Sequence, residues 1–532
     1  MRVALSILFI SIFNLLSAQS FEEFQIEVEE ISISNMPGLQ SFVTAQHEGK
    51  WLFIGGRQDG LHQRQPNSSF LSADNNKNAY VIDVQNDEVY SASLSSLSTS
   101  LYEQLQSTNM EFEQVGSRLC IIGGYGYSNT SADHITYPNL TAVDVPGLIS
   151  AIISESSING YFRQIEDERF RVTGGYLGNL NGTFYLAGGQ NFEGRYNPMG
   201  PTHGPGFFQE YTNAISSFNI NDDGTNFSIS NYAQWIDSND LHRRDYNMSA
   251  QVFADGTKGF TMFSGVFQHN VDLPWLNTVD FDANGYQVRP NFNQHLNQYH
   301  TAHMSVFDAQ NNTMHTAFFG GISRYTLDSN DQLVDDPDVP FVKTISLVTR
   351  LANDTMQESQ IGEMNGFLGS GAEFIPLQST NYFDEMNILK LNDLPNEKTL
   401  VGHIVGGIES TADNIFFVNT GSQSDASTRV FEVYIMKGTT STIDPIDGEE
   451  FFATNLYPNP ANQAAALTLS APYESRISIA IYNLQGAKVL EPFAGNARKL
   501  NLTLDLSELS SGTYQVVINN EIQKKAIGLT IQ

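Results

Sequence analysis

The chain has 532 residues, and its 58 acidic residues outnumber 27 basic ones, which gives a formal net charge of -31. This length exceeds what one ordinary core supports, so we expect several domains or a repeat architecture in which each unit is buried against its neighbours. An acidic surface repels phosphate backbones and anionic lipid head groups, which argues against nucleic acid as a partner, and we interpret the excess as a source of solubility.

The first 18 residues have the pattern of a secretory signal peptide. Arg2 precedes an apolar run from Val3 to Leu16, and two small residues follow, the second of which is Ala18. We expect cleavage after Ala18. The run is too short to span a bilayer comfortably, and no later stretch reaches about eighteen apolar residues, so no membrane span is expected.

The next element is a strand that we expect to close the fold. Residues Phe24 to Ile31 alternate apolar and polar side chains, as in a strand with one buried face. The clearest late strand is Val430 to Met436. If these two strands pair, the first and last parts of the repeat region are joined and no long strand edge stays open.

Between these two segments, a short apolar strand that ends in a glycine pair recurs six times. The pairs are Gly55 and Gly56, Gly123 and Gly124, Gly188 and Gly189, Ser264 and Gly265, Gly320 and Gly321, and Gly406 and Gly407. Their spacing leaves room for four strands per unit. Glycine permits a close approach of backbones where the inner strands of neighbouring sheets crowd together. Radial repetition of four-stranded sheets predicts a six-bladed β-propeller over residues 19–440.

Hairpins are visible between the glycine pairs. Ala79 to Val84 and Glu88 to Leu94 flank one turn, while Thr278 to Asp282 and Tyr286 to Val288 flank an Asn-Gly turn of the kind that hairpins prefer. No stretch shows sustained helical periodicity, so the predicted fold class is all-β.

The glycine pairs that follow apolar strands resemble kelch repeats, and the resemblance covers roughly Phe21 to Lys437. The sequence departs from the kelch pattern at Ser264 and in the mostly missing downstream tryptophan. Some kelch propellers are enzymes, including copper-radical sugar oxidases and sialic acid mutarotases. The oxidases need a cysteine crosslinked to a tyrosine, and the single cysteine, Cys120, lies within an apolar strand where we expect it to be buried.

The composition changes at the C-terminal end of the chain. Residues 441–454 are polar and read as a linker, and short strands with Pro, Asn and Gly turns then predict a small β-sandwich over residues 455–532. Three motifs, Leu456 to Pro460, Ile481 to Gly486 and Leu509 to Val516, resemble the type A sorting domain of the type IX secretion system of Bacteroidetes. The resemblance implies interaction with that machinery, passage through the periplasm, and secretion or attachment to the outer-membrane surface after removal of the tail.

In a four-stranded blade, the loop after the second strand and the loop between blades emerge on one face, so we expect the glycine-pair loops to surround a common mouth. Arginine forks and aromatic faces there suit a carboxylated sugar, a polysaccharide or a peptide carboxylate. The ligand-binding candidates are Arg57, His62, Tyr125, Arg195, Tyr196, His203, Arg243, Arg324 and Tyr325. Arg244 and Asp245 should also point to the mouth, where they more plausibly tie neighbouring sheets together.

Motifs for metal binding or catalysis are missing from the sequence. His300 and His303 stand three apart, a spacing that puts strand residues on opposite faces, and the acidic run Asp328 to Asp338 lacks a calcium-loop spacing. We therefore expect no metal and no cofactor. The leading interpretation is a binding protein that recognises glycan or protein through the loop-rich face. One alternative is a carbohydrate-active enzyme of the mutarotase or epimerase kind that uses the same face, and another is an adhesion component that binds through the rim.

Overall fold

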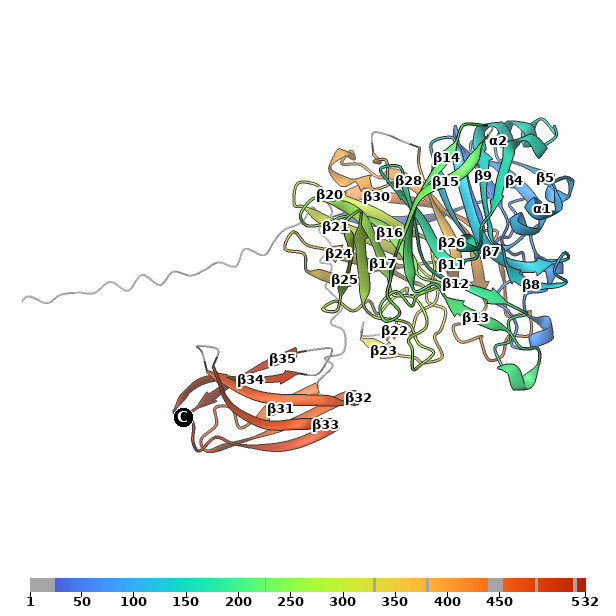
Figure 1. The fold of residues 1–532 in the computed structure, drawn as a ribbon. Helices are drawn as coiled ribbons and strands as arrows, with labels where there is room; N and C mark the ends of the chain where they lie inside the picture. The colour runs from blue at the N-terminus through green and yellow to red at the C-terminus, as the bar shows by residue number, and fades with distance from the viewer. Residues whose placement is uncertain are drawn as a thin grey trace, which may run out of the picture.

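The computed structural model describes residues 24–224, 226–328, 332–378, 382–438, 453–483, 487–519 and 524–532. The expected signal peptide, residues 1–18, and residues 441–452 of the expected linker lie outside these ranges. The described chain is mostly β, as predicted, and is built of many antiparallel sheets (Figure 1). Among the described residues, every helix is too short to cross a membrane.

Within the described part of residues 24–438, six sheets of four or five strands follow one another along the chain. The first sheet contains β2 (Val43–His47), β3 (Lys50–Ile54), β4 (Asn78–Asp83) and β5 (Glu88–Ser93). The second contains β6 (Thr108–Val115), β7 (Arg118–Ser128), β8 (Asp133–Thr136), β9 (Asn139–Asp144) and β10 (Phe162–Glu166). The third contains β11 (Thr173–Leu180), β12 (Thr183–Glu193), β13 (Phe208–Tyr211), β14 (Ala214–Asp222) and β15 (Phe227–Ile236).

The second half of this region repeats the pattern. The fourth sheet contains β16 (Asn247–Val252), β17 (Lys258–Phe263), β18 (Thr278–Asp282) and β19 (Gly285–Arg289). The fifth contains β20 (His303–Asp308), β21 (Thr313–Phe319), β24 (Thr344–Arg350), β25 (Met356–Glu363) and β27 (Leu389–Lys390). The sixth contains β26 (Phe367–Pro376), β28 (Thr399–Ser410), β29 (Ser424–Ala426), β30 (Val430–Lys437) and β1 (Phe24–Ile31). A small hairpin, β22 (Tyr325–Leu327) and β23 (Leu333–Asp335), follows the fifth glycine pair.

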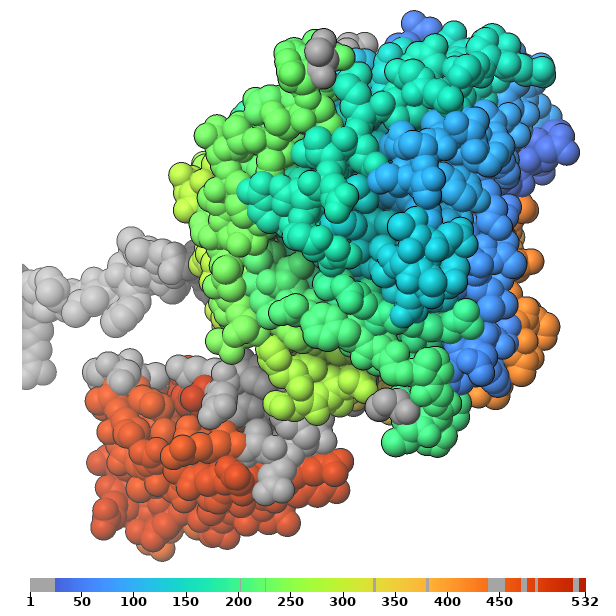
Figure 2. All heavy atoms as spheres, turned by 45° about the vertical axis from the view of Figure 1, so that its right-hand side comes forward, coloured from blue at the N-terminus to red at the C-terminus, as the bar shows by residue number. Residues whose placement is uncertain are grey.

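The predicted hairpins are confirmed, with boundaries that differ by at most one residue, and so is the predicted pairing of the two ends. Strand β1 pairs antiparallel with β30, from Phe24 opposite Lys437 to Ile31 opposite Val430. Figure 2 shows the same relation from outside, because the blue N-terminal segments adjoin the orange ones from the end of the region. The last sheet therefore contains strands from both ends of residues 24–438.

Two short helices depart from the all-β prediction: α1 (Thr99–Leu105) and α2 (Val145–Ile153). The carboxylate of Asp144 caps α2 by accepting a hydrogen bond from the N–H of Gly147 at 3.3 Å. Leu148 and Ile152 of α2 are buried in the core between the first two sheets. A helix of only nine residues, with Pro146 and Gly147 in its first turn, is too short to show a helical period in the sequence.

Hydrophobic clusters fill the spaces between consecutive sheets. Leu52 of the first sheet and Leu119 of the second belong to one cluster, and Cys120 is buried in the next, as predicted. Another cluster joins Trp51 of the first sheet to Val405 of the sixth. Each sheet thus packs face to face on the sheets before and after it, and the sixth packs on the first, which is consistent with a β-propeller.

The six glycine pairs share one backbone conformation. The first residue of each pair has φ between +56° and +69°, and the second has φ between +81° and +97°. In five of the six pairs, the N–H of the second residue donates to a carbonyl of the next sheet or of the segment leading into it, at 2.8–3.0 Å. The last of these bonds runs from Gly407 to Leu39, so it links the sixth sheet back to the first.

The second pair shows why the first residue is glycine. A Cβ on Gly123 would lie 1.8 Å from the carbonyl oxygen of Val172. The same oxygen accepts the hydrogen bond from the N–H of Gly124 at 2.9 Å. The close approach that forms the bond between sheets therefore occupies the space of a side chain.

The C-terminal residues form a sheet of their own. It contains β31 (Ala453–Tyr457), β32 (Ala464–Asn483), β33 (Lys488–Asp505), β34 (Gly512–Asn519) and β35 (Lys524–Ile531). On one side, the long strand β32 pairs with β33, and on the other it pairs first with β31 and then with β34. Residues 484–486 of the second sorting motif lie outside the described residues.

Candidate functional site

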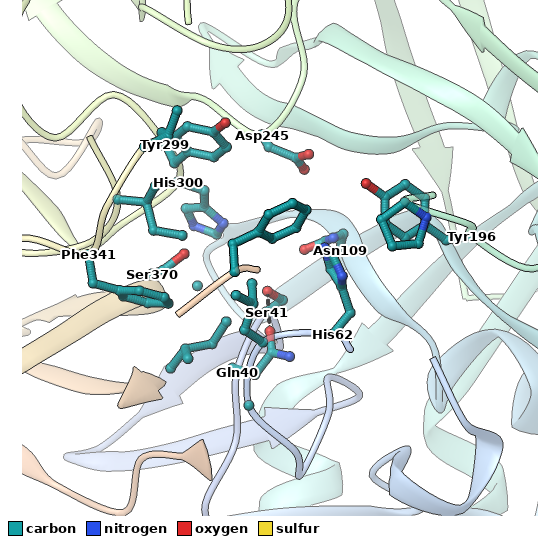
Figure 3. A pocket seen from close by; sticks show the side chains of 18 of the residues that line it. Gln40, Ser41, His62, Asn109, Tyr196, Asp245, Tyr299, His300, Phe341 and Ser370 are labelled. Carbon is teal, nitrogen blue, oxygen red and sulfur yellow. Dashed lines mark hydrogen bonds between the residues drawn. The ribbon is translucent and has the colours of Figure 1, made fainter. Parts of the chain in front are cut away.

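A cavity of about 530 Å³ lies among the loops that follow the glycine pairs and the segments that connect the sheets (Figure 3). Each of the six sheets contributes residues to its lining through these segments. The residues labelled in Figure 3 surround one space: Gln40, Ser41, His62, Asn109, Tyr196, Asp245, Tyr299, His300, Phe341 and Ser370. Of the predicted candidates, Arg57, His62, Tyr125 and Tyr196 line this cavity.

A ring of hydrogen bonds forms the floor of the cavity. Its six residues, one from each sheet or the segment leading into it, are Ser41, Asn109, Gly174, Asp245, His300 and Gly371. At five positions, the backbone N–H donates to the backbone carbonyl of the ring residue from the preceding sheet, at 2.7–3.2 Å. At the sixth position, the hydroxyl of Thr173 donates to the carbonyl of Asn109 at 3.0 Å. The ring closes because Ser41 donates to Gly371.

A second cavity of about 220 Å³ lies beyond this ring. Four ring residues with side chains, Ser41, Asn109, Asp245 and His300, line both cavities. Glu113 also lines the second cavity, and burial raises the pKa of its carboxyl to about 8. The ring is therefore a constriction between the two cavities.

Each of the two ionisable ring side chains lies close to a polar neighbour. The guanidinium of Arg244 donates to the carboxylate of Asp245, whose backbone has a φ of +47°. The Nε2 atom of His300 lies 3.2 Å from Oε1 of Glu373, and the ring of Tyr176 packs edge-on against the imidazole with centroids 5.4 Å apart. The backbone ring fixes the Cα positions, and the ion pair with Arg244 fixes the carboxylate of Asp245, whereas neither Nε2 of His300 nor Oε1 of Glu373 makes a hydrogen bond to a described residue.

One side of the cavity above the ring is lined by aromatic side chains, which we call the aromatic wall. The ring of His62 packs against Phe70 and Tyr196, with centroids 5.6 and 4.8 Å away. Burial lowers the pKa of His62 to about 4, so this imidazole is neutral at pH 7. The hydroxyl of Tyr125 donates to the carbonyl of Gly194 at 2.8 Å and accepts from the N–H of Tyr196 at 3.1 Å. These contacts turn aromatic rings and neutral polar groups toward the cavity.

The arginines singled out by the sequence are bound to other parts of the protein. Arg57 is buried and makes two hydrogen bonds of 2.6 Å to the carboxylate of Asp59. Arg324 makes the same kind of pair with Asp335, at 2.7 and 2.6 Å. Each guanidinium already makes a bidentate pair with a carboxylate of the protein, so neither is positioned to make the same pair with a ligand carboxylate.

The other predicted candidates lie outside the cavity lining. Arg243 is fully buried, and its guanidinium donates to the carbonyls of Asp240, Ser264 and Asn277. Arg195 donates to the carbonyl of Asn67 at 2.8 Å. His203 and Tyr325 belong to the loops that follow the third and fifth glycine pairs, and neither lines the cavity.

One arginine at the cavity is available. The guanidinium of Arg64 lies over the rings of Phe416 and Phe417, 5.3 and 4.5 Å from their centroids, and makes no ion pair with any described residue. Exposed carboxylates of Asp272 and Asp413 also line the cavity. The charges around the opening are thus mixed.

His300 and His303 both contact Tyr176, with ring centroids 5.4 and 6.0 Å away. His300 precedes β20, so the alternation of faces along a strand does not apply to the pair. Among the described residues, no group of three or more His, Cys, Asp or Glu side chains is arranged to hold a metal ion. Part of the acidic run, residues 329–331, lies outside the described residues.

Comparison with known proteins identifies the C-terminal domain. Residues 455–532 match the secretion system C-terminal sorting domain, which confirms the predicted sorting domain. This domain implies interaction with the type IX secretion system and export by it to the cell surface or the medium. No curated protein matches the chain.

The solved structures that are similar to this chain include the following two. The structure of YjhT has 11% sequence identity and a TM-score of 0.41, with 73% of this chain and 97% of that chain covered. A fungal alcohol oxidase of the AA5 family, in complex with copper, has 9% identity and a TM-score of 0.36, with 96% and 99% covered.

Proposed function

We propose that the protein is a secreted or cell-surface glycan-binding protein. In this proposal, residues 19–440 form a closed, six-bladed kelch-like propeller, residues 441–454 are a linker and residues 455–532 are a small sandwich that is removed during export. Support for the closed propeller comes from the pairing of β1 with β30 and from the hydrogen bonds between successive sheets. The cavity among its loops is the binding site.

The observation that carries this proposal is an aromatic wall above a polar floor. The volume of the cavity, about 530 Å³, falls within the range of about 300–1,000 Å³ that is usual for ligand sites. Rings such as Tyr196 offer flat apolar faces to sugar C–H groups, and floor groups such as Asp245 and Asn109 offer hydrogen bonds to hydroxyls. Because Arg57 and Arg244, which line the cavity, are already paired with carboxylates, a neutral sugar suits the cavity better than the carboxylated sugar considered from the sequence.

A glycan array tests this proposal, followed by calorimetric titration of the hits. We expect Tyr196→Ala to weaken binding about tenfold or more, since loss of an aromatic platform costs about 1–3 kcal/mol in comparable stacking sites. Arg324→Ala is the matched control, because Arg324 lies outside the cavity lining. Retention of full affinity by Tyr196→Ala, or equal loss in both variants, would reject the cavity as the binding site.

A carbohydrate-active enzyme of the mutarotase or epimerase kind is the second candidate. The observation in its favour is that Nε2 of His300 lies 3.2 Å from Oε1 of Glu373 at the cavity floor, because an imidazole beside a carboxylate is a common proton acceptor. A polarimetric mutarotation assay and a reducing-sugar assay on the array hits distinguish this candidate from simple binding. Turnover that is lost in His300→Gln, with binding retained, would favour the enzyme.

A further inference from the structure

The floor of the cavity has a consequence for the kind of glycan that fits. Five backbone hydrogen bonds and the hydroxyl of Thr173 link the ring residues into a belt around the constriction at the base of the cavity. The side chains of Ser41, Asn109, Asp245 and His300 extend from this belt into the constriction. A ligand that enters from the loops therefore meets a narrow polar floor.

The walls limit access from the sides. Loops from all parts of the repeat region contribute to them, with Phe70 from the first sheet, Phe192 from the third and Phe341 from the fifth. A sugar in the middle of a chain has neighbours on two sides, and both would have to pass through these walls for that sugar to reach the floor. A terminal sugar has only one neighbour, which can leave through the opening.

The polar groups at the floor are held in place without a ligand. Arg244 fixes the carboxylate of Asp245, and Oε1 of Glu373 lies 3.2 Å from Nε2 of His300 without a hydrogen bond, so Nδ1 is the imidazole atom that faces away from Glu373 and can bind a ligand. The hydroxyl of Ser41 donates to Gln40 at 2.7 Å, so its remaining capacity toward a ligand is as an acceptor. The floor is thus rich in acceptors, which complements the O–H donors of adjacent sugar hydroxyls.

From this geometry we propose that the cavity recognises the end of a neutral glycan chain, with Asp245 and His300 bound to hydroxyls of the terminal sugar. This inference rests on the proposed glycan binding and adds to it the mode of recognition. Arg64 and the aromatic rim of Phe416 and Phe417 then contact the second and third sugars, because they lie at the opening of the cavity.

Chain-length dependence tests the inference on the unmodified full-length protein. The probes are neutral malto-, cello-, manno- and laminari-oligosaccharides of two to seven sugars, with a long polymer of each type. For the series that binds, we expect an affinity per chain that is constant beyond three sugars and a stoichiometry of one protein per chain for the polymer. Cyclic β-cyclodextrin, which has no chain end, should not bind where linear maltoheptaose does.

Variants of the floor provide the second readout. We expect Asp245→Asn and His300→Gln each to weaken binding of the trisaccharide at least about tenfold, the effect of losing one hydrogen bond to a charged or strongly polar group. Arg64→Ala should weaken the trisaccharide more than the disaccharide, because Arg64 lies at the opening. Thermal unfolding of each variant shows whether it has kept its fold.

The outcomes separate the two proposals. Several proteins bound per polymer chain, or equal binding of β-cyclodextrin and maltoheptaose, would overturn end recognition and leave glycan binding intact. Floor variants that fold and bind the trisaccharide normally would overturn the role of Asp245 and His300. Failure of every probe and of the glycan array to bind would overturn the proposed function itself, and the inference with it.

Discussion

The tight contact at the second glycine pair leads to the most direct test of the fold. Alanine at Gly123 must adopt a φ of +63°, which costs an L-residue roughly 1–2 kcal/mol. Its Cβ would also stand 1.8 Å from the oxygen of Val172, so the two sheets must move apart, and overpacking of this kind costs about 1–3 kcal/mol. The shift would weaken the bond from Gly124 to Val172, a further loss of about 0.5–1.5 kcal/mol.

Gly182 is the matched control for this variant. It lies in the turn between β11 and β12 with a φ of +84°, but a Cβ there would meet no atom within 4 Å. Gly182→Ala should therefore cost only about 1 kcal/mol from its backbone conformation, while Gly123→Ala should cost about 3 kcal/mol or more. If the two variants were equally stable, the proposed close contact between Gly123 and the carbonyl of Val172 would be wrong.

Urea unfolding followed by tryptophan fluorescence measures this difference. Trp51, Trp235 and Trp275 are the three tryptophans of the chain, and all of them precede the sorting domain, so the signal reports on the repeat region. A lower midpoint with an unchanged slope would identify a loss of native stability. A changed slope would indicate that the sheets no longer unfold together.

Three other predictions concern closure, pH and export. Val28→Asp places a carboxylate on the face of β1 that packs against the core, and it should lower the free energy of unfolding in urea by about 1–3 kcal/mol. Glu29→Gln, on the exposed face of the same strand, should lower it by less than about 0.5 kcal/mol. Equal effects of the two variants would contradict closure by β1. The raised pKa of Glu113, about 8, means that the folded state holds a proton that the unfolded state loses, so this carboxyl destabilises the fold as pH rises from about 4.5 to 8. The free energy of unfolding of Glu113→Gln, measured relative to that of the wild type, should therefore be higher at pH 8 than at pH 5. If this difference between variant and wild type did not change with pH, the prediction would be wrong. Deletion of residues 455–532 should leave the protein in the periplasm, as seen by fractionation and immunoblotting, and undiminished surface delivery would reject the sorting role.

Local sequence patterns were sufficient to predict the repeated strands that end in glycine pairs and the strand pairing that joins the two ends of the region. The glycine pairs could be found because a backbone with two successive positive φ values excludes most other residues, and only Ser264 departs from glycine. The strand Phe24 to Ile31 could be found because it has one buried face. Helix α2 could not, since nine residues with Pro146 near the start show too little of a helical period.

The cavity was only partly predictable, because its floor is built from residues that are far apart in the chain. Ser41 and Asn109 each stand fourteen residues before the first glycine of a pair, whereas His300 stands twenty residues before Gly320, and the three share no residue type. What they share is their place at the inner end of a sheet, where each bonds to the ring residue beside it. Alignment of the six inner strands could have brought these positions together, but the loops between glycine pairs differ too much in length to show that alignment directly.

The arginines show why residue type alone was a poor guide to the ligand. Arg57 has its carboxylate partner only two residues away, at Asp59, while Arg324 finds Asp335 across the hairpin of β22 and β23. In both cases, the bidentate pair that could have bound a ligand carboxylate instead fixes a loop at the propeller face. Arg64 differs because its guanidinium lies over the rings of Phe416 and Phe417 and makes no ion pair with any described residue. The choice between a neutral and an acidic ligand therefore depends on which carboxylates lie within reach of each arginine, and this is a property of the folded loops.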